Sequence, residues 1–165
     1  MKIPEKIGWY LAGFVDGEGS FNVSLRKKSD YKVGWQPVLS FNVSQREQKI
    51  LTLMKRHFGC GIIKRRKDGL HSYDVTNPRS IQEKIIPFFE KYNFLSASKK
   101  RNFSIFKRIV KLMAHKEHLN IDGFRRLLEL RKKLNEGKGR KRKYTLENVL
   151  ESPETIRRDP AEGGG

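Results

Sequence analysis

A single stretch near the N-terminus, residues 9–21, places the strongest constraint on how this chain folds. It begins as a helix, because Ile7, Leu11 and Phe14 recur at helical spacing and would face a core. The helix ends in the sequence Asp-Gly-Glu-Gly at residues 16–19, and the alternation of apolar and polar residues that follows is typical of a strand. The stretch therefore predicts a helix that ends in carboxylates and passes directly into a strand.

A second face of this predicted helix is small in its middle. A glycine inside a helix costs roughly 1 kcal/mol relative to alanine, so two glycines four residues apart indicate that something is gained there. Their gain would be the close approach of another backbone. The face consists of Trp9, Ala12, Gly13, Asp16 and Gly17.

The charge of the chain indicates what kind of partner it has. Its 165 residues include 36 Lys and Arg against 18 Asp and Glu, a formal net charge of +18. A surplus of this size implies a polyanion, and nucleic acid is the default partner of a basic domain. Disulfides and a zinc cluster are excluded because Cys60 is the only cysteine, which fits a reducing, intracellular compartment.

A membrane is the competing polyanionic surface, and the sequence argues against it. No predicted helix joins a basic face to a long apolar face, and no apolar run is long enough to span a bilayer. Residues 1–20 also lack the pattern of a secretory signal, because the apolar segment carries Asp16 and Glu18.

The rest of the chain alternates strands and helices in a regular order. An Asp68-Gly69 pair is a strong hairpin signal, Ser44 is a plausible helix N-cap, and Pro87 should kink or end the helix that contains it. The pattern predicts strands over about 20–28, 36–44, 62–67 and 71–76, and helices over about 45–58, 79–92, 99–115, 121–134 and 144–150.

Polar residues on the strands form a second candidate site. On the first two strands, short amides and hydroxyls alternate with long cations, and acids are absent from this face. Such residues can contact base edges and phosphates, although plain solvation of the open face of a sheet is the opposing interpretation. We predict DNA contacts for Asn22, Ser24, Arg26, Lys28, Gln36, Ser40, Asn42, Ser44, Lys64, Arg66, Ser72 and Asp74.

A basic run follows the last long helix. Residues 137–143 contain five cations and two glycines, which suits a flexible arm on the phosphate backbone through Lys138, Arg140 and Lys141. A nuclear localisation signal is the alternative interpretation of the same run. We expect a single domain over 1–151 and a loose C-terminal tail over 152–165.

The nine residues from Leu11 to Gly19, LAGFVDGEG, resemble the motif of the LAGLIDADG homing endonucleases. The motif match, with both glycines and both acids, is far more specific than a lone glycine pattern. The resemblance implies an α+β fold of the order αββαββα. In that fold a four-stranded antiparallel sheet forms a DNA-binding saddle, and helices back it.

The resemblance also implies an active site. In the family, the acid at the eighth motif position and the carbonyl before it bind metal, which here are Glu18 and Gly17, whereas Asp16 matches an acid with a structural role. The expected cofactor is Mg²⁺, with Mn²⁺ or Ca²⁺ as possible substitutes. The resemblance further implies catalytic roles for Gln45, Lys49 and a lysine at the start of a later helix, which is Lys99 or Lys100.

Together these features predict a metal-dependent, intron-encoded endonuclease that cleaves double-stranded DNA at a specific site. Only one motif copy is present, and single-motif members of the family act as homodimers on long pseudo-palindromic sites. In the family the two motif helices form the dimer interface, which here implies an interface through Trp9, Ala12, Gly13, Asp16 and Gly17. We expect no small-molecule substrate, and the compartment stays open between a prokaryotic cytoplasm and an organelle. The alternatives are a non-cleaving nucleic-acid binder or RNA maturase on the same scaffold, and, more weakly, a basic ribosome-associated protein.

Overall fold

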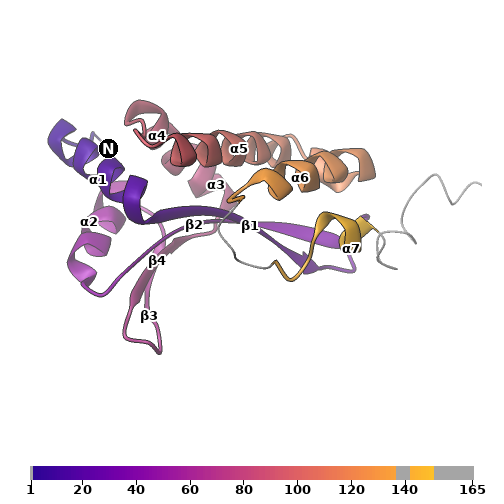
Figure 1. The fold of residues 1–165 in the computed structure, drawn as a ribbon, viewed down its shortest axis with the longest axis horizontal. Helices are drawn as coiled ribbons and strands as arrows, with labels where there is room; N and C mark the ends of the chain where they lie inside the picture. Colours follow the sequence, from indigo (N-terminus) through magenta and orange to yellow (C-terminus); the bar gives the residue numbers. More distant parts are fainter. Residues whose placement is uncertain (1, 137–141, 151–165) are drawn as a thin grey trace, which may run out of the picture. The chain divides into compact units, whose positions relative to one another are not determined.

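The computed structural model describes residues 2–136 and 142–150. It has an α+β fold with a four-stranded antiparallel sheet in the order β1-β2-β4-β3 (Figure 1), which confirms the predicted fold class. The elements are α1 Glu5–Glu18, β1 Gly19–Lys27, β2 Trp35–Gln45, α2 Gln48–Phe58, β3 Ile62–Arg65, β4 His71–Val75, α3 Pro78–Ser80, the π-helix η1 Ile81–Ile85, α4 Ile86–Lys91, α5 Ala97–Ala114, the 3-10 helix η2 Glu117–Leu119, α6 Ile121–Lys133 and α7 Leu146–Leu150.

The chain divides into two compact units. The first consists of Met1–Asn22 and Leu39–Ser104, and the second of Val23–Val38 and Ile105–Gly165. The expected single domain over 1–151 stays a prediction, and the expected tail at 152–165 lies outside the described residues. Within the described ranges, no helix is both long enough and apolar enough to cross a membrane.

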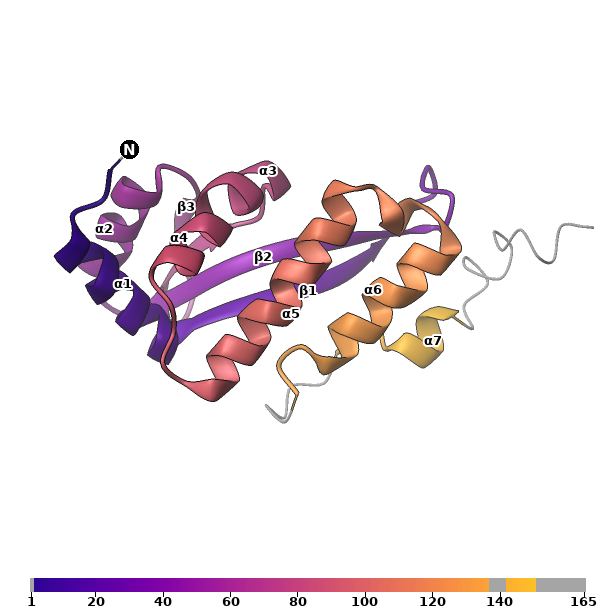
Figure 2. The same ribbon diagram turned by 90° about the horizontal axis from the view of Figure 1, so that it is seen from above.

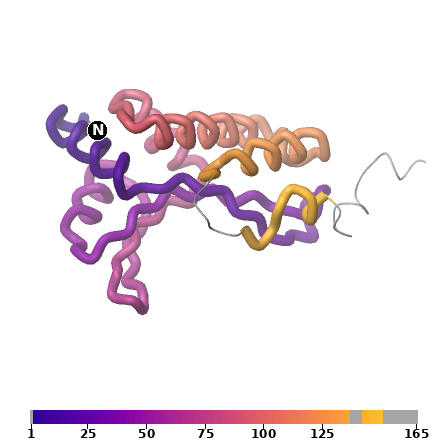
Figure 3. Tube along the Cα trace, viewed as in Figure 1, coloured from indigo at the N-terminus to yellow at the C-terminus, as the bar shows by residue number. Residues whose placement is uncertain are grey.

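The first unit is built around a cluster of aromatic side chains. Phe21 on β1 stacks on Phe41 on β2, with ring centroids 5.3 Å apart, and Phe89 on α4 stacks on Phe94 at 4.7 Å. Offset and edge-to-face ring pairs of this kind add stability beyond the area they bury. The cluster packs α4 against the sheet of this unit, whereas the β3–β4 hairpin projects away from α1 and α4 (Figure 3).

The predicted helix over 79–92 is real but contains a wider turn. Ile86 donates its backbone N–H to the carbonyl of Ile81, five residues back, which is the π-helical pattern of η1. Pro87 follows at once, and a proline ring crowds the carbonyl four residues before it in a regular helix. Pro87 therefore does not end the helix, which continues to Lys91.

One predicted helix cap is wrong. Ser44 lies inside β2, where it pairs with Ser72 of β4, and the strand continues to Gln45. The N-cap position of α2 is Glu47, whose side chain makes no capping hydrogen bond. The strand alternation extends through Ser44, and pairing with β4 decides its conformation.

The second unit has an aliphatic and aromatic core of its own. Trp35 and Phe124 are buried there with Val149 of α7, and the ring of Tyr144 lies edge-on to Trp35 at 4.8 Å. Figure 2 shows α6 beside the C-terminal half of α5, with α7 next to α6. Other buried members of this core are Leu25, Val33 and Leu128.

A buried arginine ties this unit together. The Arg131 guanidinium is 5% exposed and donates to the backbone carbonyls of Val23, at 2.7 Å, and Tyr144, at 2.6 Å. Burial, and then the charge of Arg142, lower the pKa of Arg131 to about 10. The side chain still stays charged at neutral pH, so both of its bonds are charge-assisted and stronger than bonds between neutral groups.

Candidate active site and nucleic-acid interface

The end of α1 forms the turn we call the elbow, residues 16–19. Gly19 is packed so tightly that a Cβ there would lie 2.5 Å from Cγ1 of Val15. Its backbone N–H donates to the carbonyl of Val15, which closes the last turn of the helix. Glycine at this position therefore lets α1 pass directly into β1, as the sequence predicted, and leaves the Glu18 side chain exposed.

The elbow offers two oxygen ligands of the kind that hard divalent cations prefer. One is the exposed Glu18 carboxylate, and the other is the carbonyl of Gly17, which is among the last four carbonyls of a helix and so lacks an intrahelical donor. Space around Gly17 is open, since a Cβ there would meet nothing within 4 Å. In the part of the chain that the structure describes, no cluster of three or more His, Cys, Asp or Glu could hold a metal ion. These oxygens fit a divalent cation as part of a site that other ligands must complete.

The structure distinguishes the two candidate lysines. Lys99 is 5% exposed, and its amine donates to the carbonyl of Gly19, directly after Glu18 in the chain. Lys100 is exposed to solvent. Lys99 is therefore the lysine that α5 brings to the elbow.

Asp16 has the structural, helix-end role that was expected of it. Its carboxylate accepts the backbone N–H groups of Leu95 and Ser96, both at 3.0 Å, and also the hydroxyl of Ser96. Burial raises the pKa of Asp16, but the bonds from Ser96 and Leu95 and the charge of Lys99 outweigh it, so the pKa lies below its usual value. The carboxylate is thus held ionised where α1 ends.

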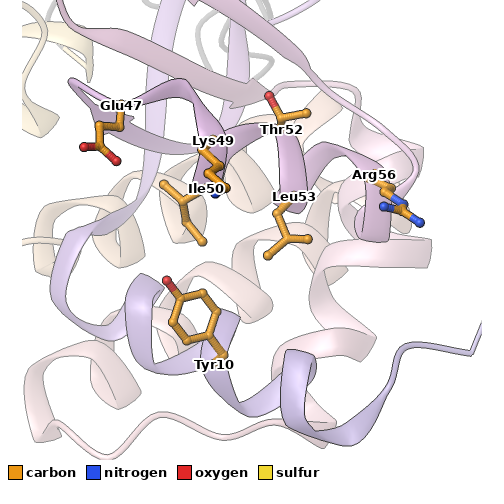
Figure 4. Close-up of a pocket in the computed structure, with 7 residues that line it drawn as sticks. All are labelled: Tyr10, Glu47, Lys49, Ile50, Thr52, Leu53 and Arg56. Carbon is orange, nitrogen blue, oxygen red and sulfur yellow. The ribbon is translucent and has the colours of Figure 1, made fainter.

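The other two expected catalytic residues come from β2 and α2 of the first unit. Gln45 ends β2, opposite His71 of β4. Lys49 lines a groove of about 340 Å³ between α1 and α2 (Figure 4). Tyr10 comes from α1 and the other lining residues from α2 or the residue before it, namely Glu47, Ile50, Thr52, Leu53 and Arg56.

The small face of α1 is only partly exposed, because Ala12 is buried and Asp16 is half-buried. Trp9 is 49% exposed, and a Cβ on Gly13 would meet nothing within 4 Å. Ala12 was expected on this face, but it is 2% exposed and packs inside the chain. The core side of α1 consists of Gly8, Leu11, Ala12 and Val15, whereas Ile7 and Phe14 are only half-buried.

Polar residues of the first unit form rows across the sheet. Asn42 of β2 lies opposite Asp74 of β4, and the next row joins Ser44, Ser72 and Lys64. These side chains are half-buried or exposed, while the residues between them on β2 and β4 are buried, as the alternation predicted. Asn22, Ser40 and Arg66 of this unit are likewise open to solvent, although Arg66 is paired with Asp68 at 3.0 Å.

The second unit carries the remaining strand residues. Ser24 and Arg26 of β1 are exposed, and Arg26 donates to the side-chain oxygen of Gln36 on β2. The amine of Lys28 lies 5.3 Å from the ring centroid of Tyr31. Lys138, Arg140 and Lys141 lie outside the described residues.

Ser96 is a site residue that the sequence analysis missed. Its hydroxyl accepts the backbone N–H of Lys99 at 3.3 Å, in the manner of a helix N-cap. The sequence does carry a signal for this role, because a serine directly before the first residue of a helix is typical of an N-cap. The burial of Lys99 could also have been predicted. Lys99 lies four residues before Phe103 and seven before Phe106, which places it on the same buried face of α5.

The chain is similar to known endonucleases. A sequence profile described as LAGLIDADG endonuclease matches residues 11–110. The chain is 32% identical over 145 residues to probable intron-encoded endonuclease 2 of Neurospora crassa, a match that covers 86% of this chain and 32% of that protein.

Solved structures of homing endonucleases have the same fold. I-SmaMI, solved with an uncleaved DNA target in the presence of calcium ions, matches with a TM-score of 0.78 and 32% identity over 92% of this chain and 50% of its own. I-TnaI matches with a TM-score of 0.79 and 29% identity over 92% of this chain and 98% of its own. The chain thus spans about a third of the Neurospora relative, half of I-SmaMI and nearly all of I-TnaI.

Proposed function

The chain belongs to the LAGLIDADG endonuclease family, and on this basis we propose that it is a homing endonuclease that hydrolyses double-stranded DNA at a specific site. The observation that carries the proposal is the elbow. An exposed carboxylate, Glu18, lies one residue from a carbonyl that holds a buried lysine amine, in a chain with a net charge of +18. A protein that only binds DNA has no need of an exposed acid on a surface meant for phosphates.

In this proposal, Glu18 and the Gly17 carbonyl hold Mg²⁺. When bound, such a cation polarises the scissile phosphate and lowers the pKa of a bound water. Lys99 adds positive charge beside the phosphate, and Gln45 and Lys49 position water and phosphate. The rows of polar residues on the strands contact base edges and the DNA backbone, with Lys138, Arg140 and Lys141 on neighbouring phosphates.

We further propose that two copies act together as a homodimer. One chain supplies only two oxygen ligands at the elbow, so a second copy supplies the other acid through contact along the exposed face of α1. The near-complete match to the I-TnaI chain supports an assembly from chains of this size. An isologous pair reads a pseudo-palindromic site. The name of the Neurospora relative supports an intron-encoded origin, with action on the genome that carries the intron.

The test has two stages, because the target sequence is unknown. Duplexes bound by the protein would first be selected from a randomised pool, and the selected duplex would then be incubated with protein and Mg²⁺. We expect discrete double-strand cuts by the wild type and none by Glu18→Gln, with unchanged DNA affinity. Tight, specific binding without any cut by the wild type would overturn the proposal in favour of a non-cleaving nucleic-acid binder.

A further inference from the structure

The start of α5 is held by a side chain from a different helix. The N–H groups that precede and open a helix have no partners within it, and here those of Leu95 and Ser96 are bonded to one oxygen of Asp16, each at 3.0 Å. The other oxygen of Asp16 accepts the Ser96 hydroxyl. A carboxylate at the end of α1 thus fixes a loop 80 residues away in the chain.

The same loop sets the position of Lys99. Ser96, while bonded to Asp16, accepts the backbone N–H of Lys99 at 3.3 Å. That bond fixes the first turn of α5, and the Lys99 amine then reaches the carbonyl of Gly19. The contacts form one closed circuit, from Asp16 through Ser96 and Lys99 back to the elbow.

Burial explains why Lys99 needs such a support. A charged amine on a side chain that is only 5% exposed is costly to hold away from water unless it is well bonded. A lysine side chain is long and flexible, so a small shift of the first turn would let the amine swing out to solvent.

We infer that Asp16, acting through Ser96, is a positioning residue that holds the amine of Lys99 against the Gly19 carbonyl, one residue from Glu18. The catalytic use of Lys99 rests on the proposed function, whereas the seating of its amine does not. The amine of Lys99 and the backbone that carries Glu18 are thereby held together before DNA binds.

The first test observes the amine directly, in the full chain without DNA or metal. Amine protons that are buried and hydrogen-bonded exchange slowly with water, so ¹⁵N-lysine NMR should show one sharp amine signal that disappears in Lys99→Arg. We expect Asp16→Asn and Ser96→Ala to broaden or remove this signal. Ser96→Thr keeps the hydroxyl and should retain it, as should Ser98→Ala, a control on the exposed neighbouring serine.

Unchanged Lys99 signals in both Asp16→Asn and Ser96→Ala would overturn the inference. If Asp16→Asn fails to fold, as judged by circular dichroism, Ser96→Ala decides alone, because it leaves the two backbone bonds to Asp16 in place. A signal lost in the Ser98→Ala control as well would also contradict the inference, since it would reflect general loosening of the loop.

The second test measures cleavage of the selected duplex under single-turnover conditions. Misplacement of a catalytic group by about 1 Å can cost roughly 100-fold in rate. We expect Ser96→Ala to lower the cleavage rate constant by up to about that factor, with the DNA dissociation constant unchanged and with Ser96→Thr close to the wild type. Weaker binding at an unchanged cleavage rate would contradict the inference. A wild type that cuts nothing would refute the proposed function, and the NMR result would still decide the seating of Lys99.

Discussion

His118 is buried without a hydrogen-bond partner for one of its ring nitrogens. The side chain is 8% exposed, and Nδ1 has no partner among the described residues. Its ring lies 6.4 Å from that of Tyr31, in the loop between β1 and β2. Burial lowers the pKa of His118 below its ordinary value of 6.5. The second unit therefore contains a histidine that folds in its neutral form.

This burial predicts a pH dependence of stability. Because the folded-state pKa is lowered, the unfolded chain binds a proton first as the pH falls. His118 therefore contributes stability above about pH 6.5 that is lost progressively below it, by at most about 1.4 kcal/mol per pH unit. Denaturant unfolding at pH 7.5 and 5.5 should show a smaller pH effect in His118→Phe than in the wild type.

The matched control is His115→Phe, because His115 is exposed and three residues away. It should keep the wild-type pH effect. Equal pH effects in His118→Phe and the wild type would show that His118 titrates alike in the folded and unfolded chain.

At the scale of the element, α1 has two sides with opposite properties. Leu11 and Val15 are fully buried, and Gly8 is covered by Tyr92, whose ring atom Cζ lies 2.2 Å from where a Cβ would be. The opposite side carries Gly13 and Gly17 in open space. Glycine at Gly8 thus serves packing within the chain, whereas the glycines at 13 and 17 leave room on a surface.

Gly13→Leu tests the use of that surface. The variant should fold, because a Cβ at this position would meet nothing within 4 Å and Gly13 is exposed to solvent. If two α1 helices pair closely, the leucine would hold them apart, and sedimentation should change from dimer to monomer. A matched control is Lys111→Leu, which adds a leucine at an exposed position of α5 and should leave the dimer intact. A Gly13→Leu variant that remains dimeric would contradict pairing through this face.

The elements differ in how well the sequence predicted them. Strands β1 and β2 were predicted to within about a residue because side-chain alternation follows burial directly. Ser44 was wrongly predicted to be a helix cap because a serine suits both a cap and the open face of a strand. Ala12 was predicted to lie on the outward face of α1 but is buried. Small residues such as alanine and glycine differ too little in hydrophobicity to mark which face of a helix is buried. Contacts distant in sequence, such as Asp16 with Ser96, leave no local pattern at all.

At the scale of the whole molecule, the charge dominates the expected interaction with DNA. The chain carries 18 more cations than acids, so DNA binding should release many counterions and weaken steeply with salt. The net charge alone does not show which Lys and Arg side chains contact the DNA phosphates. The predicted arm at Lys138, Arg140 and Lys141 has matched counterparts in the exposed Lys107, Arg108 and Lys111 of α5.

Two triple alanine variants separate these groups. Each phosphate contact contributes about 0.9 to the slope of log K against log salt. Replacing Lys138, Arg140 and Lys141 should therefore reduce the slope by up to about 2.7, uniformly across DNA sequences. The Lys107, Arg108 and Lys111 variant loses the same charge and should leave the slope unchanged, as measured by fluorescence anisotropy. Equal effects would show that net charge, not the arm, sets the salt dependence. A change of base preference in the arm variant would show that the arm reads bases.

The hydrogen bonds of Arg131 determine how far the C-terminus of this protein can be truncated. The guanidinium joins Val23 of β1 to Tyr144, and the residues after Tyr144 cover Trp35 through Val149. A fragment that stopped before Tyr144 would remove one acceptor of a buried arginine and uncover a tryptophan in the same step. Any expressed version of this protein should therefore include residues through 150. Proteins truncated before Tyr144 should be recovered mainly as aggregates.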